Sequence, residues 1–99
     1  MKMRPLDVVP YQKTSEFTEG SMPSRLFRAH QTKAAVWAKI VVLEENLTDR
    51  ILELVVEELV LDSGRYGVVE PTIKHAVLPH GGVRFYVEFY RQASPELLT

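Results

Sequence analysis

The residues with the clearest capacity for chemistry in this chain are three histidines and one glutamate. The histidines are His30, His75 and His80, and Glu88 stands inside the aromatic run RFYVEFYR. Imidazole and carboxylate groups serve as metal ligands and as general acids or bases. Glu70 and His75, the nearest candidates, are five residues apart. No spacing among them forms a recognised motif, so only the fold can assemble a set such as His30, His75 and Glu88.

Each of these residues also has an ordinary structural interpretation. His80 precedes the Gly81–Gly82 pair, where turn propensity favours a solvated loop. His30 and His75 fit structural or surface histidines, and Glu70 fits a turn carboxylate before Pro71. Charged residues in strands usually face water, and the local pattern alone would leave Glu88 there. If its face were a cavity wall, Glu88 would need a partner or a metal.

Several other chemistries are excluded by composition. The chain has no cysteine, which rules out disulfides, thiolate nucleophiles and cysteine zinc sites. It has no glycine-rich phosphate loop, no dinucleotide fingerprint and no G-x-S-x-G elbow. The 12 basic and 13 acidic residues give a net charge of −1, which argues against nucleic-acid binding.

Length and hydropathy indicate one soluble domain. Its 99 residues allow a real but modest core, which oligomerisation would supplement. No apolar run approaches the roughly 20 residues of a membrane helix, and no signal peptide is recognisable. We therefore expect a single domain over residues 1–99, with a core over about 8–91, a loose tail over 92–99 and a cytoplasmic location.

The elements that must position these residues are predicted to be strands. An edge strand is expected at VVPYQKT because Pro10 is tolerated there, and RLFRAH alternates weakly. AAVWAKIVVLE, apolar on nearly both faces, suits a central strand followed by a turn at EEN. VVEPTIKHAVLP and VRFYVEFYR are two further strands joined by HGG. Many short strands with turn signals predict an all-β sandwich or barrel.

The segment 47–64 is ambiguous by pattern alone. Thr48 fits a helix cap, and the apolar residues after it follow both a helical stripe and a strand-like alternation. Periodicity leans slightly to a helix, whereas the β-branched residues favour strands.

At the level of whole segments, the chain resembles the small YeaR/TehB-like family of cupin-type proteins related to tellurite resistance. The resemblance covers roughly residues 8–91, and its most specific pieces are HQTKAAVW, VVEPTIKH and VRFYVEFYR. It implies a cupin-like barrel, a double-stranded β-helix or jelly roll. It also implies strands and a turn over 47–64, against the local pattern.

The resemblance further implies a metal site at one mouth of the barrel. His30, His75 and Glu88 match the family's two histidines and acidic residue, a set with open positions that suits Zn, Fe, Mn or Ni. The surrounding pocket would contain Lys33, Trp37, Glu70, Tyr86 and Tyr90. The general cupin pattern is H-x-H followed by glutamate; here Thr32 replaces the second histidine, and Trp37 or Ala38 stands near the expected glutamate.

Three functions follow as hypotheses. The first is a metal-binding protein of tellurite or oxyanion stress, whose metal polarises a ligand or activates water. The second is a non-catalytic module that binds a small anion or organic ligand. The third is a structural or regulatory homodimer without a ligand. Some relatives carry a fused S-adenosylmethionine-dependent methyltransferase, but this sequence has neither the length nor the glycine-rich motif for one. Whether the chain is an enzyme stays open.

Overall fold

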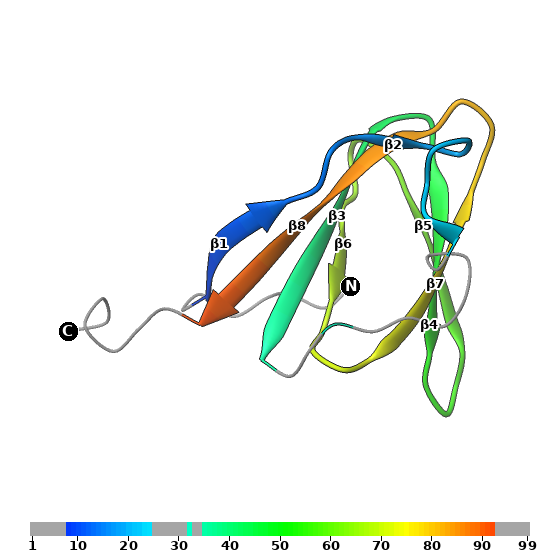
Figure 1. The fold of residues 1–99 in the computed structure, drawn as a ribbon. Helices are drawn as coiled ribbons and strands as arrows, with labels where there is room; N and C mark the ends of the chain where they lie inside the picture. The colour runs from blue at the N-terminus through cyan, green and yellow to red at the C-terminus, as the bar shows by residue number, and fades with distance from the viewer. Residues whose placement is uncertain (1–7, 25–31, 33–34, 93–99) are drawn as a thin grey trace.

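The described chain consists of β-strands arranged in two antiparallel sheets (Figure 1). The computed structural model describes residues 8–24, 32 and 35–92. The predicted all-β class is therefore confirmed. No helix in this described part is long and apolar enough to cross a lipid bilayer.

The larger sheet has five strands and is built around the last one. Its members are β1 (Val8–Lys13), β2 (Phe17–Thr18), β3 (Val36–Glu44), β6 (Gly67–Val69) and β8 (Arg84–Gln92). Their order is β1-β8-β3-β6, and β2 pairs with the beginning of β8. The expected positions of two strands are thus correct: the first strand, with Pro10, lies at an edge, and the apolar β3 lies inside the sheet.

The smaller sheet has three strands in the order β5-β4-β7. These are β4 (Leu47–Leu52), β5 (Glu57–Leu61) and β7 (Lys74–Pro79). The ambiguous segment 47–64 therefore forms two strands and a connection, as the resemblance implied and against the helical periodicity. Tertiary burial decides this, because the alternation in β4 places Leu47, Asp49 and Ile51 on one face of the sheet.

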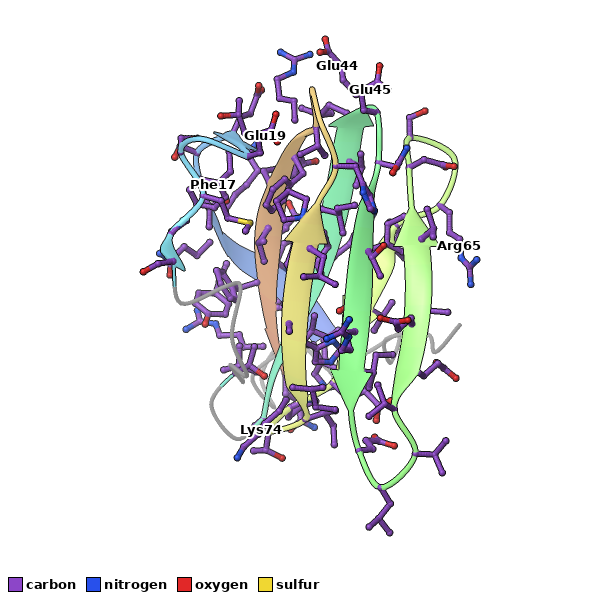
Figure 2. All side chains as sticks on the ribbon, turned by 90° about the vertical axis from the view of Figure 1, so that its right-hand side faces the viewer. Phe17, Glu19, Glu44, Glu45, Arg65 and Lys74 are labelled. Atoms are coloured by element: carbon purple, nitrogen blue, oxygen red, sulfur yellow. The ribbon has the colours of Figure 1, made fainter. Side chains whose placement is uncertain are left out.

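The core lies between the two sheets. β8 contributes Phe85, which is fully buried, and Val87 and Phe89 pack against the same cluster. The smaller sheet contributes Leu47, Leu61 and Val77. Phe17, labelled in Figure 2, meets Phe85 edge to face with ring centroids 5.7 Å apart. Burial of these side chains is the main favourable contribution to folding.

The two sheets are open, not closed into the barrel that we expected. Within the described residues no strand pairing joins them: β6 pairs only with β3, and β5 only with β4. β6 has three residues, too few to carry hydrogen bonds along the length of a second neighbour. The sheets are therefore held together by side-chain packing.

One predicted strand is divided in two. The segment 68–79 was expected to be continuous, but it passes from β6 in the larger sheet to β7 in the smaller one. Pro71 lacks the N–H that a sheet ladder needs. Thr72 has a φ of +63°, and Ile73 N donates to Glu70 O at 3.3 Å. This turn lets the chain change sheets, which brings His75 into a strand next to β4.

Candidate functional site

A buried hydrogen bond between Asp49 and His75 is the most unusual feature of the described interior. Asp49 is 0% exposed and His75 is 1% exposed. Nδ1 of His75 lies 2.8 Å from Oδ1 of Asp49. Buried polar groups of this kind are costly unless they are hydrogen-bonded. The contact is therefore a constraint on how β4 and β7 are aligned.

Strand register explains why the two side chains meet. In the β4–β7 pair, Asp49 stands opposite Val77, and Ile51 stands opposite His75. Asp49 and His75 are thus diagonal neighbours on one face of the sheet, a distance that long side chains can bridge. Asp49 shares its face with Leu47, and His75 shares its face with Val77; both of these belong to the core cluster. Asp49 and His75 therefore turn toward the larger sheet.

The hydrogen-bond roles in the pair follow from its chemistry. A carboxylate accepts but does not donate, so Nδ1 carries the hydrogen and donates to Asp49. Nε2 of His75 and Oδ2 of Asp49 are also buried, and neither has a hydrogen-bond partner within the described part of the chain. Such groups in a native interior call for an explanation, for example a ligand or a water molecule.

A cavity of about 200 Å³ opens beside His75. Both sheets contribute to its wall: Ile51 comes from β4, Leu59 from β5 and Val68 from β6. Val55, in the β4–β5 connection, and Ile73 extend the apolar lining. The cavity belongs to the end of the molecule where Lys74 begins β7, opposite the Glu44–Glu45 turn (Figure 2).

His75 stands at the wall of this cavity, and Asp49 does not line it. Because Asp49 takes up Nδ1, we infer that the free Nε2 is the ring nitrogen turned toward the cavity. The charged lining consists of Glu53, Glu57 and Glu70, and no described lysine or arginine lines it. The cavity therefore combines apolar walls, one buried ring nitrogen and negative charge.

Two of the residues proposed from sequence, His75 and Glu70, lie at this cavity. Glu88 does not join them. Phe85, Val87 and Phe89 turn toward the core, so alternation turns Glu88 to the opposite face of the larger sheet. There its carboxylate accepts a hydrogen bond from Tyr90. The structure therefore does not bring Glu88 and His75 to a shared site.

The other aromatic residues proposed for the pocket accompany Glu88. Trp37 is paired with Tyr90, and both alternate with core-facing neighbours. Tyr86 lies on the same face, where the ammonium of Lys13 is 4.8 Å from its ring centroid. This face is a layer of aromatic and charged side chains, of which Tyr90 is buried, and none of them lines the cavity.

His30 and Lys33 lie outside the described residues. Within the described ranges, no group of three or more His, Cys, Asp or Glu side chains is arranged to hold a metal ion. At the cavity, the described residues supply one imidazole, that of His75, whereas a protein metal site of this type needs three or four ligands. By themselves they do not fit a metal centre.

Asp49 is the residue that sequence reasoning missed. It occupies an alternating position between Leu47 and Ile51, both of which turn toward the interior. A carboxylate in the apolar register of a strand predicts a buried, paired group. Glu53 and Glu57 carry no such signal in the sequence, because their place at a cavity depends on how β5 folds back on β4.

We expect Asp49 and His75 to be strongly coupled in stability. Asp49→Ala leaves the buried imidazole without its acceptor, at a cost of about 1–3 kcal/mol in the free energy of unfolding. In a double-mutant cycle with His75→Ala, the coupling free energy should be about 0.5–3 kcal/mol. Urea unfolding of the four proteins measures it.

The matched control is the Arg50–Glu58 pair on the same sheet. Its Nε–Oε2 distance is also 2.8 Å, but its side chains are 42% and 50% exposed. A cycle on this pair should give about 1 kcal/mol or less. Equal coupling in the two cycles would contradict a special role for burial of the Asp49–His75 pair.

Comparison with known proteins identifies solved structures of similar fold and a matching domain family. A protein from E.coli (strain K12), solved in a structural genomics programme, has a TM-score of 0.85 at 14% identity, covering 95% of this chain and 100% of that one. TehB from Haemophilus influenzae has a TM-score of 0.81 at 23% identity, covering 88% of this chain and 32% of TehB. This chain thus spans about a third of TehB.

No curated protein matches in sequence. The TehB-like domain family matches residues 12–87, and the chain belongs to this family.

Proposed function

We propose that this chain is a small-molecule-binding domain that serves resistance to tellurite or a related oxyanion. The observation that carries the proposal is the buried, unpartnered Nε2 of His75 at the wall of an apolar cavity. Membership of the TehB-like family supports the link to tellurite, which the sequence resemblance implied. The cavity would be the binding site, and His75 would orient the ligand by a hydrogen bond.

The Asp49–His75 contact supports binding over catalysis. Asp49 fixes the ring orientation, so Nε2 is presented to a ligand without loss of side-chain freedom. No serine, threonine or cysteine of the described chain lines the cavity, so its described lining offers no hydroxyl or thiol nucleophile. We therefore assign His75 a positioning role in the proposed domain.

The cupin relation is part of the same proposal. The pairs β1–β8, β3–β6 and β4–β5 are nested along the chain. Nested antiparallel pairs in two facing sheets are typical of jelly rolls. Proteins of this architecture commonly bind a ligand between their two sheets.

A metal ion bound through His75 is the second candidate. An imidazole whose Nδ1 donates to a carboxylate and whose Nε2 is free has the arrangement of a metal-binding histidine. A complete site would need further ligands, and His30 was predicted to be one. Zn, Fe, Mn and Ni would all suit such a set.

We also propose a homodimer that buries exposed apolar side chains of the smaller sheet. Leu54, Val55 and Val56 form the β4–β5 connection and are 106%, 82% and 54% exposed. Val60, on β5, is 52% exposed. β5 pairs only with β4 in the described chain, so its other edge is open to a second copy.

The proposed function predicts an effect on tellurite tolerance. Expression of the wild-type chain should raise the potassium tellurite concentration that inhibits a sensitive bacterial strain. His75→Ala should lower tolerance to that of cells without the chain. Ile73→Trp, which narrows the cavity and leaves the Asp49–His75 pair intact, should do the same.

His80→Ala is the matched control for this experiment. His80 is exposed and bonds Thr48 at 2.9 Å, away from the cavity. The variant should protect like the wild type at equal soluble protein levels. If Ile73→Trp and His75→Ala both protect fully, the cavity has no part in resistance.

Elemental analysis separates the ligand and metal candidates. The proposed small-molecule site predicts less than about a tenth of an equivalent of Zn, Fe, Mn or Ni per chain in protein purified without a tag or added metal. About one equivalent per chain, lost in His75→Ala and kept in His80→Ala, would establish the metal candidate instead.

Light scattering tests the homodimer. The wild-type chain should have the mass of two chains at about 100 μM, and Val60→Lys should have the mass of one, since a lysine on an edge strand opposes pairing. Gln12→Lys, a charge change on the exposed edge strand of the other sheet, should leave the mass unchanged. A wild-type monomer at this concentration would refute the dimer.

A further inference from the structure

We infer that the cavity at His75 takes an organic cation, an ammonium group carrying an apolar chain, and not an oxyanion. The inference rests on the proposed binding function and deepens it by naming the class of ligand. Three independent features of the cavity support it: the charge of its lining, the hydrogen-bonding state of His75 and the apolar character of its walls.

The charge of the lining favours a cation. Glu53 and Glu57, both exposed, line the cavity, and no lysine or arginine of the described chain does. Nearby basic residues are turned elsewhere: Arg50 bonds Glu58 at 2.8 Å, and Lys74 is exposed next to His75. Carboxylates of one sign around a partly apolar cavity concentrate the field and attract the opposite charge. An oxyanion would meet repulsion from the same groups.

The hydrogen bond to Asp49 gives His75 a matching role. Nδ1 of the ring is taken up by Asp49, so Nε2 is the nitrogen left for a ligand. Nε2 is buried and has no partner in the described chain. A ligand with a hydrogen-bonding head group would satisfy it. The charge of the lining then decides the charge of that head group.

The apolar walls of the cavity favour a ligand that carries a hydrocarbon chain. Ile51, Leu59 and Ile73 are half-buried and line the cavity together with the buried Val68. A chain of carbon atoms lying against them would remove apolar surface from water, at about 25 cal/mol per Å². Val55, 82% exposed, lies at the mouth and would be covered by a ligand that extends outward.

The test compares three ligands with one carbon chain and different head groups. These are hexylammonium, 1-hexanol and hexanoate, titrated into the full chain with ¹⁵N-labelled histidine. We expect hexylammonium to shift the imidazole ¹⁵N resonances of His75 and to bind about tenfold tighter than hexanoate, with hexanol between them. Raising the salt to about 0.5 M should weaken hexylammonium binding and leave hexanol binding unchanged.

Charge variants place the effect at the cavity. Glu57→Gln should weaken hexylammonium binding about threefold and leave hexanol binding unchanged. Glu45→Gln makes the same change in net charge at the opposite end of the molecule (Figure 2) and should change neither affinity. Both glutamates are exposed, so both variants are expected to fold.

The outcomes distinguish this inference from the proposed function. Hexanoate that binds as tightly as hexylammonium, or tighter, with shifts at His75 would overturn the cation inference and leave the binding site in place. Equal weakening by Glu57→Gln and Glu45→Gln would likewise overturn it. If none of the three compounds shifts His75, the cavity is not a ligand site and both proposals fail.

Discussion

The buried hydrogen bond between Asp49 and His75 is the interaction on which the site depends. A carboxylate and an imidazole in a nearly dry interior destabilise the fold unless they meet. Their meeting requires that β4 and β7 pair in one register, because a slip by one residue would turn either side chain to the opposite face. The 2.8 Å contact therefore links the alignment of the smaller sheet to the orientation of the ring at the cavity.

Close packing around the Asp49–His75 pair leaves little room for other side-chain positions. Gly67 in β6 lies against Leu61 and Asp49: a Cβ there would be 2.5 Å from Cδ1 of Leu61 and 3.6 Å from Oδ2 of Asp49. Leu61 is fully buried, so it has no room to move aside. The absence of a side chain at position 67 lets the larger sheet approach the smaller one, and the two sheets together form the wall of the cavity.

The two faces of the larger sheet have separate characters. The inner face carries Phe85 and its apolar neighbours. The outer face holds cations over aromatic rings, with Lys39 4.4 Å from the centroid of Tyr66 and Lys13 4.8 Å from that of Tyr86. Such contacts contribute modestly at exposed sites. Glu88, which the sequence suggested as a ligand, belongs to this outer layer, so the polar chemistry of the molecule is divided between two places.

Local sequence was sufficient for the strand-rich class, the edge position of the first strand, the central position of β3 and the turns at 44–46 and 80–82. These depend on β-branched composition and on Pro and Gly, which act within a few residues. The family resemblance added the strands over 47–64. Sequence also selected His75 and Glu70, but it grouped them with Glu88 and overlooked Asp49.

Tertiary structure decided which of these residues meet. Asp49 and His75 are 26 positions apart, and their contact depends on strand register and on the turn at Pro71 that moves the chain between sheets. Which polar group is buried, and beside which partner, is a property of two packed sheets and not of any one segment. The sequence by itself determined the strands, and the packing determined the site.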